Sequence, residues 1–475
     1  MGPRNMAQGS SQKPEFFVNP EFITTKTRAI ADRKRENTPV PRFTALVPRG
    51  HTVPVLNKNT LVESPDGSYR DGPSTHGTDR FERRRADIVA AAIPVLNDQG
   101  FKGMRLTAVA ELIGLRATGV TYYFPRKEEL AVACIESGFA VLDGLVAEAE
   151  REPDAGARIT QLIALFTARD AAVRQGEAVP LASFSAIRSL EGEHRDRAVE
   201  GYKAMFRRVR ALLESPELAA MDQTDRTIRA IILLEQLFWA ASWLCDFDIE
   251  DYPRLAARMA DIVLNGVAPG AIADPIPSLT APARPLASRD ESKESFLKAA
   301  TRQINEHGYR GASVDRISAS LNLTKGAFYH HNEAKDDLVA ACFRRSFTIM
   351  RETQIEARAL AAPEACRLAA TVEALIRFQL GPEGPLLRTS VLSSMPVEHK
   401  TEILGHSYRI SRQFASMVVD AITDGSARAV DPMVAGAMVH AAINIAADAR
   451  PLAMAQAPDI VARFVRPIFA GFLAA

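Results

Sequence analysis

The sequence repeats itself at a constant spacing of 208 residues, and this repeat limits the folds open to the chain more than any other feature. The segment Gly100-Phe101-Lys102-Gly103 recurs as Gly308-Tyr309-Arg310-Gly311. Further pairs at the same spacing are Leu106 with Val314, Val109 with Ile317, Ile113 with Leu321, Leu115 with Leu323, Lys127 with Lys335, Leu130 with Leu338, Cys134 with Cys342 and Phe139 with Phe347. The register holds without a gap over about fifty residues, which indicates a duplicated module.

Each copy has the hydrophobic spacing of helices. In the first copy apolar residues recur every three or four positions over 88–96, and Gly100 ends that helix. A short helix follows, ending at Gly114 in the first copy and at Asn322 in the second. Glycine and asparagine best tolerate the left-handed conformation of a tight turn. A second short helix and then a longer one come next, so the pattern predicts a helix-turn-helix in each copy and an all-α fold.

Two proline-rich breaks divide the chain. Residues 1–79 hold nine prolines and no sustained helical period, which is typical of a mostly disordered arm. A second break begins near Ala268 and reads as an interdomain linker. The expected domains are the arm at 1–79, a helix-turn-helix domain at 80–145, a helical body at 146–268, a linker at 269–287, a second helix-turn-helix domain at 288–353 and a second helical body at 354–475.

The net charge of only +1 means that any contact with nucleic acid must come from local clusters of Lys and Arg. The four cysteines have no CxxC spacing, which disfavours a zinc site or a disulfide framework and suits a reducing compartment. We find no run of about 18 apolar residues and no secretion signal, so we expect a cytoplasmic, nucleoid-associated protein without a membrane partner.

Enzyme motifs are absent from the sequence. It has no phosphate-cradling GxxxxGK[ST], no GxGxxG after a strand, no HExxH and no GxSxG, so we expect no enzyme activity and no cofactor. The acidic cluster Glu191, Glu193, His194 and Asp196 fits no standard metal spacing and is typical of a solvated helix end. We therefore expect no metal site.

Both copies resemble the TetR family of one-component transcriptional regulators. The second copy, GYRGASVDRISASLNLTKGAFYHHNEAKDDLV at 308–339, follows the family pattern along its length. The first copy, GFKGMRLTAVAELIGLRATGVTYYFPRKEEL at 100–130, follows it at both ends and less well in the middle. Members of this family are all-helical dimers with a three-helix DNA-binding head and a ligand-binding body. The resemblance therefore implies two heads and two bodies in one chain, arranged as an internal pseudo-dimer, with further self-association open.

In the family, the last two helices of each body pack together between protomers. The resemblance places these helices at about 224–266 and 431–473 in this chain. Small residues dominate the second stretch and would allow close helix approach, although they equally suit an ordinary tight core.

The resemblance also assigns DNA contacts. In the second head these are Ser313, Thr324, Lys325, Gly326, Tyr329, His330 and Lys335. Ser313 matches a residue that caps its helix and donates to phosphate, and Gly326 stands where the recognition helix approaches the DNA. Tyr329, His330 and Lys335 match phosphate contacts.

The first head departs from this pattern. Its expected DNA contacts are Arg83, Arg84, Arg105, Arg116, Ala117, Thr118, Thr121, Tyr122, Tyr123 and Lys127. Arg105 adds a charge where a hydroxyl is usual, and Thr121 replaces the tyrosine. Arg116 is placed either to read a guanine or to give only nonspecific attraction. Because the heads differ, we expect an asymmetric operator with two unlike half-sites.

We expect a DNA-binding regulator, a repressor by the family's common mode, that an apolar small molecule releases from a double-stranded DNA operator. Candidate effector-binding residues are the aromatic side chains of the first body, Phe166, Phe184, Phe206, Phe238, Trp239 and Trp243. Aromatic residues at helical spacing also suit a plain core. The alternative function is a ligand-sensing or partner-binding protein whose heads no longer bind DNA specifically.

Overall fold

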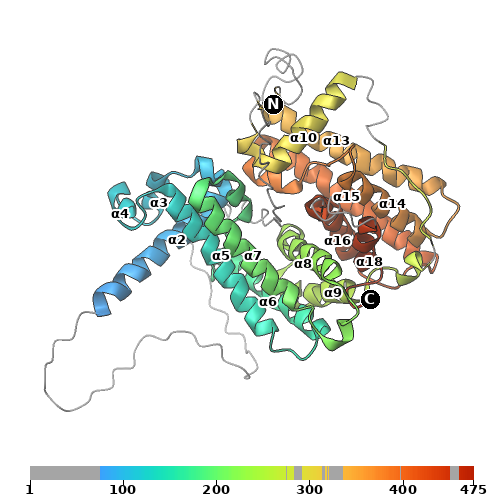
Figure 1. Cartoon of the computed structure of the whole chain (residues 1–475), viewed down its shortest axis with the longest axis horizontal. Helices are drawn as coiled ribbons and strands as arrows, with labels where there is room; N and C mark the ends of the chain where they lie inside the picture. Colours follow the sequence, from blue (N-terminus) through green and yellow to red (C-terminus); the bar gives the residue numbers. More distant parts are fainter. Residues whose placement is uncertain are drawn as a thin grey trace, which may run out of the picture.

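The protein is built of helices, and the described residues contain no strand. The computed structural model describes residues 75–273, 275–282, 291–312, 316–317, 319, 335–395, 397–449 and 459–474 (Figure 1). The α-helices of the first half are α2 (Thr75–Gly103), α3 (Leu106–Leu112), α4 (Ala117–Tyr123), α5 (Lys127–Ala149), α6 (Ala155–Gln175), α7 (Gly192–Ala211), α8 (Gln223–Trp243) and α9 (Tyr252–Asn265). Those of the second half are α10 (Glu291–Gly311), α13 (Lys335–Glu356), α14 (Glu364–Leu380), α15 (Val397–Thr423), α16 (Pro432–Ile445) and α18 (Ile460–Phe469).

Short 3-10 turns connect these helices. They are η1 (Phe184–Ser189), η2 (Pro216–Leu218), η3 (Leu244–Asp246), η4 (Ile249–Asp251), η5 (Pro269–Ile272), η6 (Ala357–Ala359), η7 (Thr389–Ser394) and η8 (Ala446–Ala449).

The two halves repeat backbone detail as well as helix order. Helix α2 is interrupted at Gly100 (φ 62°, ψ 171°) and α10 at Gly308 (φ 71°, ψ 169°), a conformation that glycine adopts most readily. The Cys134 thiol lies 3.8 Å from its acceptor, the Val89 carbonyl oxygen, and the Cys342 thiol 3.6 Å from that of Leu297. Both bonds join residues 45 positions apart at the 208-residue spacing. The interruption of α2 at Gly100 confirms the helix end that the sequence predicts there.

A buried asparagine ties each first helix to the body beneath it. The Asn97 amide donates to the Leu181 carbonyl (2.7 Å), and its oxygen accepts from the Ser183 backbone N–H (2.7 Å). In the second half Asn305 donates to Leu386 (2.9 Å) and accepts from Arg388 (3.1 Å). Each side chain satisfies backbone groups that would be costly to bury unpaired.

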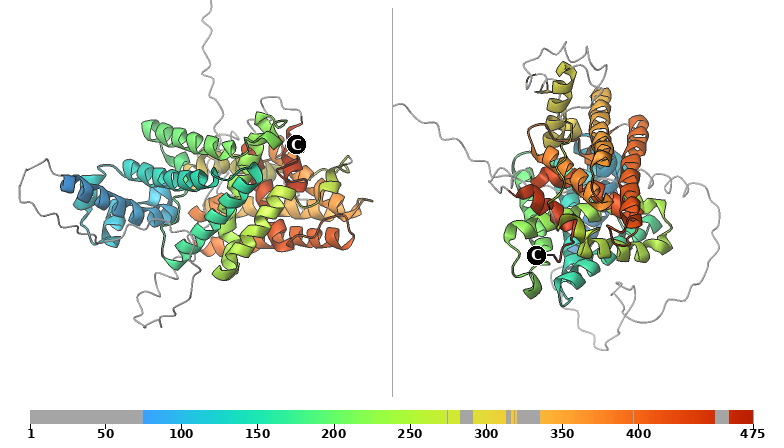
Figure 2. Two further views of the ribbon diagram at one scale, coloured as in Figure 1. Left: turned by 90° about the horizontal axis from the view of Figure 1, so that it is seen from below. Right: turned by 90° about the vertical axis from the view of Figure 1, so that its right-hand side faces the viewer.

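The bodies contact each other through α8 and α9 on one side and α16 and α18 on the other, and these four helices meet near the middle of the molecule (Figures 1 and 2). Nearly every side chain of α8 and α16 is buried, so both helices are apolar around most of their circumference. The first helices also reach across: α2 contacts η7, and α10 contacts η1.

The helices do not begin or end at the expected domain limits in three places. Helix α2 begins at Thr75 rather than at residue 80. Helices α5 and α13 run without a break through the expected boundaries at 145/146 and 353/354. The proline-rich stretch after Ala268 starts with η5, which packs against α14 and α18, so its first residues are part of the body rather than a free spacer.

Four stretches of the described residues are long and apolar enough, by length and composition only, to cross a membrane: Lys127–Ala149, Gln223–Asp246, Ile249–Ile272 and Pro432–Ala449. The sequence reading, which required an uninterrupted apolar run, did not identify them. In Gln223–Asp246, 94% of the most apolar window is buried inside the protein. The apolar side chains of this helix therefore serve the protein's own interior.

Candidate DNA-binding surface and interior cavities

Helices α3 and α4 form a two-helix unit in the first head. The chain turns between them at Gly114, whose φ of +65° is the left-handed conformation expected from the sequence. The Leu115 N–H closes the turn by donating to the Ala110 carbonyl (2.9 Å). Arg116 is the N-cap residue just before α4, and Val120 anchors the helix by its full burial. This is the geometry of a helix-turn-helix, and the role of α4 as its recognition helix stays a prediction.

The structure places the expected DNA contacts of the first head on one small unit. Exposed members are Arg83, Arg105, Arg116, Thr118, Thr121 and Tyr122, and half-buried ones are Arg84, Ala117, Tyr123 and Lys127. Tyr122 is 72% exposed, a large exposure for so large a ring. The unit therefore presents cations, hydroxyls and one phenol to solvent.

Arg84, Thr121 and Lys127 have local partners. Arg84 pairs with Asp87 (3.6 Å), and the Thr121 hydroxyl donates to the Thr118 carbonyl (3.1 Å) of its own helix. The Lys127 ammonium lies 4.6 Å from the centre of the Phe101 ring. A cation on an aromatic face is held in place, which restricts how far Lys127 reaches toward a phosphate.

Sequence reasoning missed an aromatic cluster that supports α4. The Phe81 ring centre lies 4.7 Å from that of Tyr123 and 6.1 Å from that of Tyr122. This cluster packs the first part of α2 against the end of α4 and so supports the position of α4. The two tyrosines were noted only as DNA contacts, although an aromatic residue two positions before Arg83 was the available signal.

Most expected contacts of the second head lie outside the described residues: Ser313, Thr324, Lys325, Gly326, Tyr329 and His330. Lys335 is described, and its ammonium lies 4.8 Å from the centre of the Tyr309 ring. This contact repeats that of Lys127 on Phe101, because both pairs are related by the 208-residue spacing.

The two halves are joined by backbone hydrogen bonds that come in matched pairs. Val267 N–H donates to Ile468 (3.2 Å), and Phe472 N–H donates to Val263 (2.8 Å). Ala268 N–H donates to Phe469 (3.1 Å), and Leu473 N–H lies 3.5 Å from the Leu264 carbonyl oxygen. Each bond maps onto its counterpart when 205 is added to its residue in the first half and subtracted from its residue in the second half. We call the segments 263–268 and 468–473 the seam.

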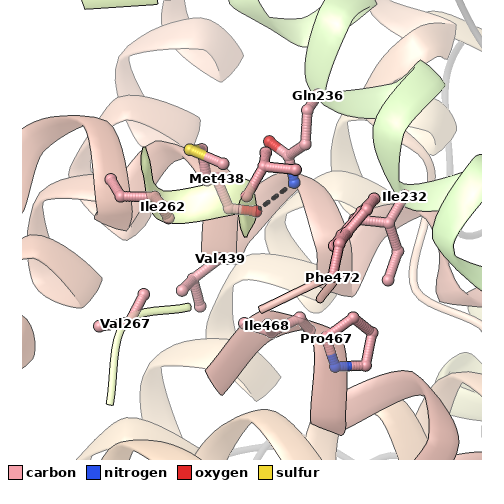
Figure 3. Close-up of a pocket in the computed structure, with 10 residues that line it drawn as sticks. Ile232, Gln236, Ile262, Val267, Met438, Val439, Pro467, Ile468 and Phe472 are labelled. Carbon is pink, nitrogen blue, oxygen red and sulfur yellow. Dashed lines mark hydrogen bonds between the residues drawn. The ribbon is translucent and has the colours of Figure 1, made fainter. Parts of the chain in front are cut away.

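Glycines make the seam possible. A Cβ on Gly266 (φ +68°) would lie 2.1 Å from the Phe469 carbonyl oxygen, and one on Gly471 (φ +88°) would lie 2.1 Å from that of Leu264. No side chain fits at such distances from backbone. Beside the seam is a small apolar cavity between the halves, where the Gln236 amide donates to the Met438 carbonyl at 2.9 Å (Figure 3).

A second cross-seam contact comes from a buried cation. Arg229 on α8 donates to the carbonyls of Phe472 (3.0 Å) and Ala474 (2.6 Å). Burial lowers the pKa of this guanidinium to about 10. Through these two hydrogen bonds, Arg229 holds the segment that follows α18 in place.

The aromatic residues proposed for an effector site form part of the core: Phe166, Phe184, Phe206, Phe238, Trp239 and Trp243 are all less than 9% exposed. Phe184 and Phe238 lie edge to face at 5.9 Å, while Trp239 packs on His440 of the second half at 5.8 Å. The cavity beside the seam is lined by other residues, so an effector site among these rings stays a prediction.

Cysteine and metal chemistry offer little in the described part of the chain. All four thiols are free, and burial raises the pKa of both Cys134 and Cys342 to about 12. A thiol of that pKa is inert at neutral pH. Among the described residues, no group of three or more His, Cys, Asp or Glu side chains is placed to hold a metal ion.

Known proteins match a limited part of this chain. Residues 296–342 match the model for bacterial regulatory proteins of the tetR family. The TetC protein of transposon Tn10 from Escherichia coli is 37% identical over 57 residues, which are 12% of this chain and 29% of TetC. The transcriptional repressor AcnR of Corynebacterium efficiens is 37% identical over 65 residues, 14% of this chain and 35% of AcnR. The chain thus spans about a third of the length of these relatives.

Among solved structures, a TetR-family transcriptional regulator from Bordetella parapertussis aligns with a TM-score of 0.33 and 18% identity, over 38% of this chain and 94% of that chain. The family match makes residues 296–342 a TetR-family helix-turn-helix domain. It does not extend to 100–130, so the same assignment for the first copy stays a prediction.

Proposed function

We propose that this chain, which carries a TetR-family helix-turn-helix domain at residues 296–342, is a sequence-specific DNA-binding transcriptional regulator. The observation that carries the proposal is the helix-turn-helix geometry of α3 and α4, with Arg105 and Arg116 exposed at the starts of the two helices. Arginine at the start of a recognition helix is placed to meet a base edge or a phosphate.

The chain acts as its own dimer in this proposal. Support comes from the matched seam bonds between the halves and from the equivalent asparagine and cysteine contacts within each half. In this proposal, two heads related in this way would each offer a recognition helix to one DNA duplex. Because Thr121 occupies the place of Tyr329, the two half-sites are expected to differ in sequence.

Repression relieved by an effector is the proposed mode. The contacts of α2 with η7 and of α10 with η1 support coupling, because each first helix touches the other half. A ligand that shifts one body therefore biases both heads, provided that it binds the two head arrangements with different affinity. The proposed location is the cytoplasm, in association with the nucleoid.

Selection of the purified full chain on a random DNA library at about physiological salt tests this function. Enrichment of a bipartite site with two unlike halves is the expected result. A strictly palindromic site would show that a single head works and that separate chains pair. Absence of any enriched sequence would overturn DNA regulation.

The competing function, a sensor with degenerate heads, draws on the local bonds of the first head. The Thr121 hydroxyl donates to its own helix and the Lys127 ammonium lies on the Phe101 ring, so both side chains already have a partner within the protein. Equal binding of all sequences, weakened by salt, would favour this candidate.

A further inference from the structure

The outer ends of the two bodies carry opposite charges at matching positions. In the first body Asp143 and Glu150 on or just after α5 both pair with Arg208 of α7, at 3.3 Å and 2.9 Å. The equivalent positions, 208 residues later on α13 and η6, are Arg351 and Arg358. Two carboxylates have thus been replaced by two guanidinium groups.

The partner has changed as well. Adding 205, the offset that relates the seam bonds, to Arg208 gives Gln413 on α15. Arg351 donates to the Gln413 side-chain oxygen at 2.9 Å, so the same two helix positions are in contact in both halves. Gln413 is neutral, and no ion pair of Arg351 or Arg358 is found in the described part of the chain. Burial, together with the nearby charge of Arg358, lowers the pKa of Arg351.

A buried glutamine lies between the two arginines. Gln354 is 2% exposed, and neither its amide nitrogen nor its amide oxygen has a hydrogen-bond partner within the described residues. The equivalent residue of the first body is Val146, which is fully buried and needs no partner. An unpaired buried amide costs about 1–3 kcal/mol, so it calls for a ligand or water.

Gln354 lines a pocket between α13, α14 and α15, three helices that pack together in the second body (Figure 1). Arg351, Arg358 and Gln413 line it too, and we call it the α13–α15 pocket. The remaining lining residues are Glu364, Arg367, Ser416, Met417 and Asp420. Glu364 is paired with Arg367, and Asp420 is exposed without an ion pair to either pocket arginine among the described residues.

We propose that the α13–α15 pocket binds a small oxyanion group, the carboxylate or phosphate of an effector molecule, through Arg351, Arg358 and the Gln354 amide. Guanidinium groups match carboxylate and phosphate geometry by donating two parallel hydrogen bonds. The anion restores the negative charge that Asp143 and Glu150 supply in the first body. Its use as an effector rests on the proposed regulatory function, whereas the binding itself does not.

The first body supplies the test variant. The substitutions Arg351→Asp, Gln354→Val, Arg358→Glu and Gln413→Arg copy the first-body arrangement into the second body, where a folded precedent exists. Arg412→Gln, an exposed arginine on α15 outside the pocket, is the control for loss of charge. Far-UV circular dichroism and melting temperature establish that each full-length variant is folded.

Calorimetric titration of the full chain without DNA measures binding of inorganic phosphate and, separately, of acetate, at constant ionic strength in chloride. Saturable binding of either anion by the native chain, weakened at least about tenfold by the four substitutions and unchanged by Arg412→Gln, supports the site. The stronger of the two anions identifies the source of the oxyanion. No saturable heat with either anion, or equal binding by the four-substitution variant, overturns the proposal and leaves water as the partner of Gln354.

The library selection described above keeps the two proposals separate. A chain that binds phosphate but selects no DNA retains the pocket and loses the regulatory function. A chain that selects a bipartite site but binds neither anion loses only the pocket.

Discussion

The asparagine bonds that join each head to its body and the backbone bonds of the seam are equivalent in the two halves, whereas the polar contacts at the ends of α5 and α13 differ. Asn97 and Asn305 make equivalent bonds, and the seam bonds of Val267 and Phe472 are equivalent as well. At the outer end of the bodies, Val146 of the first half is the residue equivalent to Gln354 of the second half. The backbone bonds between the halves and the asparagine bonds between head and body are therefore retained, whereas the side-chain contacts at the ends of α5 and α13 have changed.

The heads fall between these extremes. Lys127 on Phe101 and Lys335 on Tyr309 are equivalent, so the support of the helix that follows the recognition helix is retained. The predicted recognition residues differ, since Arg116 and Thr121 stand where the second copy has Thr324 and Tyr329. The lysine contacts that support each head are thus retained, whereas the residues proposed to contact bases differ between the two heads.

Breaking the seam should have the largest effect on stability. Gly266→Ala introduces a Cβ against the Phe469 carbonyl at a φ of +68°, and we expect it to cost about 3 kcal/mol or more of unfolding free energy. Urea unfolding followed by circular dichroism measures the loss. Gly425→Ala is the control, because its φ is +78° in open space and it carries only the backbone cost of about 1–2 kcal/mol. Equal costs for the two variants would show that the seam is not tightly packed.

Acid should weaken the second half more than the first, because the buried His440 on α16 has Glu235 as its equivalent on α8. Burial lowers the pKa of His440 to about 4, below its usual 6.5, so the folded state resists protonation. Stability from this group is complete above pH 6.5 and is lost as pH falls toward 4, by about 3 kcal/mol. Comparing the pH dependence of unfolding free energy in the native chain and in His440→Gln isolates this contribution.

His194→Gln, on the partly exposed first turn of α7, serves as the control for removing an imidazole. An unchanged pH profile in His440→Gln would contradict the assignment of the acid sensitivity to this side chain.

The fold was largely predictable because the 208-residue repeat carries it. The helix end at Gly100 and the turn at Gly114 follow from the conformational freedom of glycine, and both are confirmed. The seam was missed, because the halves are offset there by 205 rather than 208 residues. A search at one fixed spacing cannot align Gly266 with Gly471, because α14 has 17 residues where α6 has 21, and the offset has become 205 by the ends of these helices at Gln175 and Leu380.

The candidate sites were less predictable, because side-chain partners depend on packing. The sequence marks Lys127 as a cation but not the aromatic ring beneath it. Trp239 was assigned to a pocket, yet it packs on His440 of the other half. A buried glutamine such as Gln354 looks in the sequence like any surface glutamine, and only its burial without a partner draws attention to it.

The two heads can be compared by removing one arginine. Arg116→Ala should weaken binding to the first half-site by about 1–3 kcal/mol if its guanidinium reads a guanine, with relaxed preference at that base alone. Competition binding with a library of single-base variants of the selected site measures both effects. Uniform weakening across all sequences would instead assign Arg116 to a phosphate.

The smallest expected effect concerns the lysines that the two heads share. Lys127→Met removes a cation that is held on Phe101, and it should reduce the slope of log binding constant against log salt by about one unit or less. Lys335→Met should do the same in the second head, because its ammonium has the same position on Tyr309. Equal slopes for the two variants would show that both heads engage DNA through equivalent backbone contacts while reading different bases. A loss in Lys335→Met alone would assign DNA binding to the second head and leave the first as a structural copy.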